Sequence, residues 1–488
     1  MDIKKIKTLG QLKKAGYVAK SIKQELRDNL VKKLENKERV FQGIIGFEDT
    51  VLPDIERAIL SKHNILLLGL RGQAKTRIAR MMTELLDDYI PVVAGSEIND
   101  DPLMPLSRYG IDTVAEQGDK TQITWVHKTD RYVEKLATPD VSVADLIGDV
   151  DPIKAAALKL PYSDERVIHF GLVPRSHRSI FVLNELPDLQ ARIQVSLFNI
   201  LQEGDLQIRG FKLRFPMDIQ FVFTANPEDY TNRGSIVTPL KDRIESQILT
   251  HYPKTIEIAR TITEQEAILE PAQSEKVHIV SDLRTLLEQV SFNARESEYV
   301  DEKSGVSARM SISALENLVS AAERRALING DKRTSVRITD FWGIIPSITG
   351  KVELVYEGEQ EGPYGVAIEL INQSIKESFL ESFIDPDKSV KSDKDPYGPI
   401  KEWFSSGNRV ELLNDDSEKD FRSKLDKISG LKKLASDYSK DKDEVYYIME
   451  LILHGLAACE AIGKDIIDTQ MNFSDPLAGM FDDLVSDE

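Results

Sequence analysis

The sequence is poor in the residues that cross-link a fold or bind structural metals. Its 488 residues contain one cysteine, Cys459, and seven histidines. A single cysteine excludes an internal disulfide framework and a Cys-rich zinc site, and it is typical of proteins in a reducing compartment. No pair of histidines has the HExxH spacing of a zinc hydrolase. We therefore expect no zinc site in this chain.

Long hydrophobic runs are also missing. The longest clearly apolar run is residues 65–68, whereas a transmembrane helix needs roughly 20 apolar residues. The first residues are basic, but no apolar segment of a secretory signal follows them. These observations predict a cytoplasmic protein without membrane insertion.

Positive charge is in deficit, with 63 Lys and Arg against 81 Asp and Glu and a net charge of −18. This balance argues against a surface that binds nucleic acid, and we expect no nucleic-acid partner. Residues 1–40 differ, because twelve basic and five acidic side chains give them a charge of +7. Apolar residues at helical spacing predict a helix over 18–39. Its basic face is either solvated or docks on an acidic partner or a neighbouring subunit.

From residue 41 the pattern alternates between buried strands and helices. This alternation predicts an α/β fold whose parallel sheet is sandwiched by helices, while residues 96–165 show no clear period. The predicted strands are 64–68, 90–93, 180–183 and 219–224, with short strands around 123–126, and the predicted helices are 54–60, 76–87 and 188–202.

After residue 253 the predicted strands largely stop. Residues 349–363 and 385–400 gather Gly, Pro, Asp and Lys, and we interpret them as a connector and a linker. The predicted helices are 254–270, 281–293, 311–328 and 338–345. The predicted parts are a basic helical segment 1–40, an α/β domain 41–253, an all-α lid domain 254–350, a connector 351–400 and a C-terminal helical domain with an acidic tail 401–488.

Residues 65–76 read ILLLGLRGQAKT, a buried strand, a loop and the start of a helix. This is the layout of a phosphate-binding P-loop, in which backbone N–H groups of the loop surround phosphate oxygens. Lys75 would reach the β- and γ-phosphates of ATP, and the Thr76 hydroxyl would bind Mg²⁺. Ala74 replaces the last glycine of the usual pattern and disfavours a positive φ. The loop residues assigned to nucleotide binding are Gly69, Gly72, Gln73, Ala74, Lys75 and Thr76.

Polar residues follow the next two apolar strands. Glu185 fits a carboxylate that polarises an attacking water, and Asn184 stands where an aspartate is expected to organise Mg²⁺ through water. Asn226 fits a residue that positions water or contacts the γ-phosphate, although Asn-Pro is also a common turn signal. Arg243 suits a phosphate in a neighbouring subunit's site, and the alternative is a surface arginine paired with aspartate. The cluster Arg175, His177 and Arg178 faces either phosphate, a neighbouring subunit or solvent.

Together these segments resemble the AAA+ ATPases, most closely the branch of the magnesium chelatase ATPase subunit (subunit I) and the MoxR proteins. The match covers about residues 40–350 in the order of the family's motifs and includes 138–149, 171–189, 201–209 and 224–243. The resemblance implies a P-loop NTPase core followed by an α-helical lid domain. It also implies a ring-shaped homo-oligomer, commonly a hexamer, that binds ATP between subunits and works with a von Willebrand A domain protein.

The resemblance also implies roles for single residues. Ile44 and Ile45 would pack on adenine, because the segment from Gly43 to Gly46 is similar to the family's backbone hinge. Asn226 would be sensor 1, Arg243 the arginine finger and Arg309 sensor 2.

We expect an ATPase that remodels a partner protein or assists metal insertion, with slow hydrolysis because of Asn184. The alternative is a hydrolysis-poor scaffold whose ATP binding controls assembly with a partner. A third class is a nucleic-acid motor or a transcriptional activator. The charge of −18 argues against both, and the sequence lacks the GAFTGA signature of the activators. The sequence does not identify the protein or substrate on which the ATPase would act.

Overall fold

The computed structural model describes residues 3, 5–162, 164–206, 208, 215–227, 235–389, 395–467 and 470–476. The chain divides into two compact units, Met1–His251 and Tyr252–Glu488. This boundary lies close to the predicted end of the α/β domain at residue 253. Within the described residues, no helix has both the length and the hydropathy needed to cross a bilayer.

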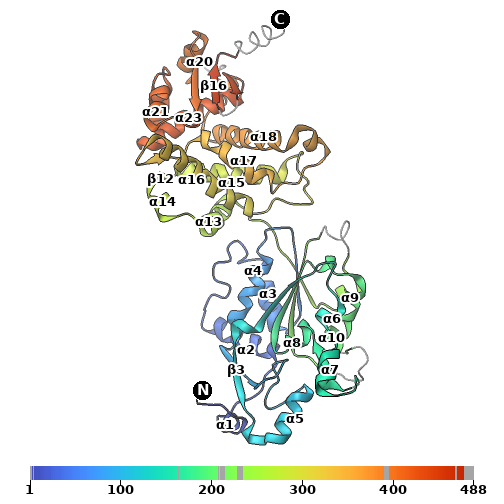
Figure 1. Cartoon of the computed structure of the whole chain (residues 1–488). Coiled ribbons are helices and arrows are strands. Elements are labelled where there is room, and N and C mark those ends of the chain that lie inside the picture. Colours follow the sequence, from blue (N-terminus) through green and yellow to red (C-terminus); the bar gives the residue numbers. More distant parts are fainter. Residues whose placement is uncertain are drawn as a thin grey trace. The chain divides into compact units, whose positions relative to one another are not determined.

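A five-stranded parallel sheet forms the centre of the first unit (Figure 1). The predicted strands at 64–68, 180–183 and 219–224 are confirmed as its three inner strands. The two edge strands were not predicted, because each is partly exposed and lacks a continuous apolar run. In spatial order the strands are β11 (Ser246–Leu249), β1 (Ile65–Leu68), β10 (Ile219–Ala225), β7 (Ser179–Asn184) and β4 (Tyr132–Leu136).

Helices cover both faces of this sheet, as the sequence predicts (Figure 1). Alternate residues of each inner strand face opposite ways, so Leu67 packs in one core and Leu66 in the other. One face carries α2 (Ile22–Glu35), α3 (Val51–Leu60) and α4 (Lys75–Met81), which continues into η1 (Met82–Leu85). The other carries α6 (Val143–Leu146), α8 (Leu172–Arg175), α9 (Ala191–Ser196), α10 (Phe198–Glu203) and α12 (Thr238–Asp242).

The region 96–165 contains more regular structure than its sequence suggests. The predicted strand 90–93 exists as β2 (Tyr89–Val93), but it pairs antiparallel with β3 (Ile123–His127) outside the main sheet. A second antiparallel pair is formed by β5 (Gly148–Val150) and β6 (Ile168–Phe170). The other elements of this region are α5 (Arg108–Gln117), α7 (Pro152–Leu158) and the 3-10 turns η2 (Gly118–Lys120) and η3 (Lys128–Arg131). Later in the unit come the 3-10 turns η4 (Glu165–Val167) and η5 (Leu186–Asp188) and the antiparallel strand pair β8 (Asp205–Leu206) and β9 (Phe215–Pro216).

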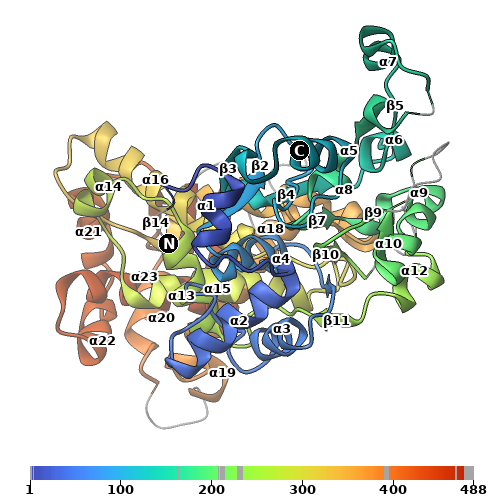
Figure 2. The same ribbon diagram turned by 90° about the horizontal axis from the view of Figure 1, so that it is seen from below.

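The basic N-terminal segment is part of the first unit. Helix α1 (Leu9–Lys14) begins beside β3, since Ile123 N donates to the Lys7 carbonyl at 3.0 Å. Figure 2 shows α2 side by side with α3, and Leu26 and Leu30 of α2 are fully buried. The predicted helix 18–39 is confirmed in its central part. Its apolar side therefore packs on its own chain.

The second unit is mainly helical, as predicted after residue 253. One hydrophobic core runs from Val277 to Phe473 through most of its elements. The helices are α13 (Ile256–Glu266), α14 (Pro271–Lys276), α15 (Ser281–Glu296), α16 (Arg309–Asn329), η6 (Ile338–Ile344), α17 (Ile345–Thr349), α18 (Tyr356–Ser382), α19 (Pro386–Ser389), α20 (Gly398–Ser405), α21 (Glu418–Asp426), α22 (Leu431–Tyr438) and α23 (Lys442–Ala458).

Two features of this unit differ from the predicted elements. Helix α18 fills most of the segment interpreted as a connector, and the Gly-Pro pair there marks a break at Gly362 (φ 83°). The C-terminal part contains strands as well as helices: β14 (Val410–Leu413), β16 (Gln470–Ser474) and β15 (Gly463–Ile467) form an antiparallel sheet. The segment predicted to be an all-α lid also contains a short parallel strand pair, β12 (Val277–His278) and β13 (Thr334–Ser335). The five-part division stays a prediction. Parts of the linker, of 201–209 and 224–243, and of the acidic tail lie outside the described residues.

Candidate functional site

The loop between β1 and α4 is built around Gly69. A Cβ at this position would overlap Thr250 Oγ1 and Gln73 Oε1, so only glycine fits. Thr250 Oγ1 donates to Gln73 Oε1 at 2.6 Å, and Thr250 N donates to the Leu68 carbonyl at 2.7 Å. Gln73 is therefore held by the end of β11 and is 6% exposed. These contacts anchor the loop to the end of the sheet.

Ala74 adopts the left-handed conformation that its side chain disfavours. Its φ and ψ are 55° and 13°, and Gly72 has φ 74°. A left-handed conformation costs an L-residue roughly 1–2 kcal/mol. The loop thus follows a path that suits glycine at both positions, and Ala74 takes this path with strain.

Lys75 begins α4 and is almost fully buried. Its ammonium donates to the Gly69 carbonyl and, at 3.0 Å, to the Leu70 carbonyl. The side chain therefore folds back over the loop that precedes it. A cation in this place can bind the oxygens of a phosphate that the loop surrounds.

The end of β7 meets the start of α4 through Asn184. Asn184 Oδ1 accepts hydrogen bonds from Thr76 Oγ1 at 3.4 Å and from Thr224 Oγ1 at 3.0 Å. Asn184 Nδ2 donates to Glu134 Oε1 at 2.7 Å. The side chains of four elements, α4, β7, β10 and β4, thus converge on one amide group.

Glu185 and Asn226 directly follow two neighbouring strands, β7 and β10. Glu185 has φ 53° and ψ 52°, and its N–H donates to Thr224 Oγ1 at 3.2 Å. Non-glycine residues with positive φ occur often at functional sites. Asn226 is 7% exposed and follows Ala225, whose carbonyl accepts from Gly69 N at 3.1 Å. Both residues therefore lie at the carboxyl ends of the strands beside the loop.

The predicted hinge also lies in this unit. Gly43 and Gly46 have φ of 83° and 82°, so the chain reverses around Ile44 and Ile45 in a way that requires glycine. Ile44 is buried in the core against which Ala74 packs.

The two arginines expected to act on phosphate, Arg243 and Arg309, belong to different units. Arg243 donates to Gln202 Oε1 at 2.9 Å and to the Pro239 carbonyl at 2.7 Å, and it lies over the Phe198 ring. These contacts hold it against α10 and α12. Arg309 opens α16 in the second unit and is exposed.

The oxygen atoms at the carboxyl ends of these strands are suitable ligands for a hard divalent cation. Mg²⁺ prefers hydroxyl, carbonyl, carboxylate and water oxygens. The Thr76 hydroxyl, the Asn184 carbonyl oxygen and the Glu134 carboxylate provide these types within one network. These residues could hold Mg²⁺ directly or through water.

Sequence reasoning missed three side chains that support the site: Glu134 and Thr224, which hydrogen-bond Asn184, and Thr250, which hydrogen-bonds Gln73. Glu134 lies on an edge strand without an apolar run, so that strand itself was not predicted. The alternation Tyr132, Glu134, Leu136 was the available signal, because it places these residues on one face of a strand.

The cluster Arg175, His177 and Arg178 is only partly a surface feature. The Arg178 guanidinium is buried, 3.1 Å from Asp101 and 2.8 Å from Tyr17 Oη. His177 Nδ1 accepts from Asp218 N at 3.0 Å, and burial together with the charge of Arg178 lowers the pKa of His177 to about 4. His177 and Arg178 therefore face neither solvent nor phosphate.

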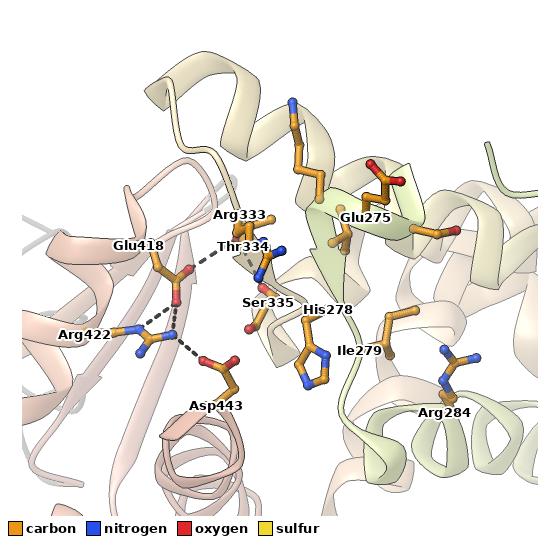
Figure 3. A pocket seen from close by; sticks show the side chains of 13 residues that line it. Glu275, His278, Ile279, Arg284, Arg333, Thr334, Ser335, Glu418, Arg422 and Asp443 are labelled. Atoms are coloured by element: carbon orange, nitrogen blue, oxygen red, sulfur yellow. Dashed lines mark hydrogen bonds and ion pairs between the residues drawn. The ribbon is translucent and has the colours of Figure 1, made fainter. Parts of the chain in front are cut away.

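A separate cavity of about 600 Å³ lies in the second unit, between β12, β13, α21 and the start of α23 (Figure 3). Arg422 points to Glu418 and Asp443, with N–O distances of 2.7 and 2.6 Å. Arg284 pairs with Glu264 at 3.1 Å. These ion pairs neutralise two of the arginines that line the cavity.

No protein-family model matches the chain. Similar solved structures include NtrX from Brucella abortus (15% identity, TM-score 0.34, covering 59% of this chain and 55% of NtrX), which is also matched in complexes with ATP and ADP. The chain thus spans about half the length of NtrX.

Two further similar structures are matched over nearly their whole length. A provisionally assigned ATPase from Cytophaga hutchinsonii has 18% identity and a TM-score of 0.27, covering 74% of this chain and 97% of that one. The complex of magnesium chelatase subunits BchI and BchD has 18% identity and a TM-score of 0.33, covering 66% and 98%. Because these identities and TM-scores are low, the function is inferred from the geometry of the chain itself.

Proposed function

We propose that the chain is an AAA+ ATPase of the MoxR and magnesium chelatase type, which binds and hydrolyses ATP. One observation carries the proposal: Thr76, directly after Lys75, hydrogen-bonds Asn184, directly before Glu185. The phosphate loop and the strand end that carries the carboxylate therefore belong to one site. A loop that resembled a phosphate-binding loop only by chance would not be expected to contact the strand end that carries Asn184 and Glu185.

Each residue of this site has a distinct task in phosphoryl transfer. The loop backbone and Lys75 bind the phosphates, and Thr76 and Asn184 would hold Mg²⁺. Bound Mg²⁺ would neutralise charge on the phosphates. Glu185 orients and polarises the attacking water. Asn226 stands at the neighbouring strand end, where it can contact that water or the γ-phosphate.

The remaining expected features concern assembly. We propose a homo-oligomeric ring, a hexamer by resemblance, in which Arg243 of one subunit reaches the ATP of the next and Arg309 contacts nucleotide from the lid. A von Willebrand A domain protein is the proposed partner, and the energy of hydrolysis would remodel it or assist metal insertion. We place this activity in the cytoplasm, because a single cysteine fits a reducing compartment.

Asn184 supports a second candidate, a scaffold in which ATP binding without turnover controls assembly. An amide brings no charge to the metal, so the hold on Mg²⁺ and its waters is weaker than with aspartate. This candidate predicts nucleotide-dependent oligomers without phosphate release above background.

Nucleotide binding by the full chain and its Lys75→Ala variant tests the site. We expect the wild type to bind a fluorescent ATP analogue and to form larger particles when ATP is added, as measured by light scattering. Lys75→Ala should lose most of the binding, whereas Arg77→Ala, an exposed cation of the same helix, should retain it. Equal binding by all three proteins would contradict the assignment.

A further inference from the structure

The strand end at β7 lacks a carboxylate at position 184, yet a carboxylate reaches the same place from β4. The two strands are parallel, with Glu134 opposite Val182 and Leu136 opposite Asn184. Glu134 and Asn184 therefore project from the same face of the sheet, the face that α4 covers. Their side chains meet at 2.7 Å.

This contact fixes the orientation of the Asn184 amide. An ionised carboxylate only accepts hydrogen bonds, so it selects the orientation in which Nδ2 faces Glu134. The opposite atom, Oδ1, then faces the hydroxyls of Thr76 and Thr224. When Thr76 donates its proton to Asn184, the lone pairs of its oxygen are available for another ligand.

Glu134 is itself held firmly. Its second oxygen, Oε2, accepts from Arg80 Nη2 at 2.9 Å and from Tyr132 Oη at 3.0 Å. The Glu134 side chain is 27% exposed and that of Arg80 is 67% exposed. Arg80 therefore approaches the carboxylate from the solvent side, while Oε1 faces the interior of the site.

We propose that Glu134 is the positioning residue for the metal ion of this site and supplies, from the neighbouring strand, the negative charge that position 184 lacks. It acts through Asn184, whose Oδ1 it directs toward Thr76. This inference rests on the proposed ATP-binding function and adds a carboxylate that the sequence motifs do not reveal. It also predicts that Asn184→Asp does not strengthen the site, because two carboxylates would then lie within hydrogen-bond distance and repel each other.

The test measures how Mg²⁺ tightens the binding of a fluorescent ATP analogue to the full chain. Glu134→Gln removes the charge and lets the Asn184 amide take either orientation. Losing an outer partner of a metal ligand typically weakens metal binding about 10–100-fold, so we expect the Mg²⁺ concentration at half effect to rise at least about tenfold. Binding measured in EDTA should be unchanged, which separates a metal effect from a general loss of structure.

An exchange of charges between the two positions makes the test specific. In the double variant Glu134→Gln/Asn184→Asp, the amide introduced on β4 can donate to the carboxylate introduced on β7, and the pair again contains one carboxylate. We expect this variant to regain a wild-type Mg²⁺ requirement, whereas Asn184→Asp alone should not improve on the wild type. Glu84→Gln, the same change at a 60% exposed carboxylate that pairs with Lys128, is the matched control.

Two results would overturn the inference while leaving ATP binding intact. One is an unchanged Mg²⁺ requirement in Glu134→Gln, and the other is a double variant no better than that single variant. A wild-type chain that binds the ATP analogue neither with Mg²⁺ nor in EDTA would instead overturn the proposed function, and this inference with it.

Discussion

Glu25 and Arg131 form a buried ion pair with two hydrogen bonds of 2.7 Å each. Their side chains are 5% and 0% exposed. Glu25 lies on α2 in the basic N-terminal segment, whereas Arg131 directly precedes β4. Glu25 also accepts from Asp87 N at 2.7 Å. This pair ties α2 to the edge of the sheet that carries Glu134, so the N-terminal segment supports the candidate site.

Glu25→Gln is therefore expected to destabilise the first unit. Removing one partner of a buried ion pair leaves an uncompensated charge and costs about 3–5 kcal/mol. Hydrogen-exchange mass spectrometry of peptides from α2 should show faster exchange. Asp119→Asn breaks the exposed pair with Lys13 and should change stability by less than about 1 kcal/mol. Equal exchange in the Glu25 and Asp119 variants would contradict this role.

Ala74→Gly is expected to stabilise the phosphate loop. Relief of the left-handed alanine outweighs the extra chain entropy of glycine by about 0.5–1 kcal/mol. Amides of α4 should exchange more slowly, and the ATP analogue should bind at least as tightly. Ala79→Gly in the same helix is the matched control, because glycine inside a helix costs about 1 kcal/mol and should have the opposite effect. Destabilisation by Ala74→Gly would show that the φ of Ala74 is not a source of strain.

His177 predicts a defined pH dependence. Its pKa is lowered to about 4 in the folded chain, whereas an unfolded histidine has a pKa of about 6.5. The unfolded chain therefore takes up a proton first, and this contribution to stability is lost as the pH falls from about 6.5 to about 4. Asp218, whose pKa burial raises to about 6, changes stability in the opposite direction. Comparing the wild type with a variant that lacks His177 therefore separates the effect of this histidine on stability from that of Asp218.

His177→Asn keeps an acceptor for Asp218 N and removes the titration. It should be less stable than the wild type at pH 7, and the gap should narrow by about 2 kcal/mol at about pH 5. Urea unfolding at both pH values measures this gap, and the same substitution at the exposed His169 is the control. A gap that stays constant with pH would contradict the buried, neutral state of His177.

The sequence predicts the inner part of the fold better than its edges. Strands β1, β7 and β10 are buried on both faces, so each is rich in apolar residues and is visible without structure. Strands β4 and β11 have exposed residues and mixed composition. Strand β2 has the apolar run of an inner strand, but it pairs with β3 elsewhere.

The residues of the candidate site also fall into two groups, those that local sequence patterns reveal and those that they do not. Lys75, Thr76, Asn184 and Glu185 follow from local patterns of strand, loop and helix. The partner of Asn184 does not, because Glu134 is 50 residues away along the chain and reaches the site only through strand pairing. Likewise, Thr250 holds Gln73 across 177 residues. Local motifs identify the residues of such a site, but only the sheet order reveals their supports.

Phosphate release by the wild type and by Glu185→Gln, at an ATP concentration that saturates both, tests the proposed function most directly. We expect the variant to bind ATP as the wild type does, while its steady-state rate falls clearly below the wild-type rate. The glutamine keeps the shape of the side chain but cannot polarise water as a carboxylate does. Equal rates for the two proteins would contradict hydrolysis at this site.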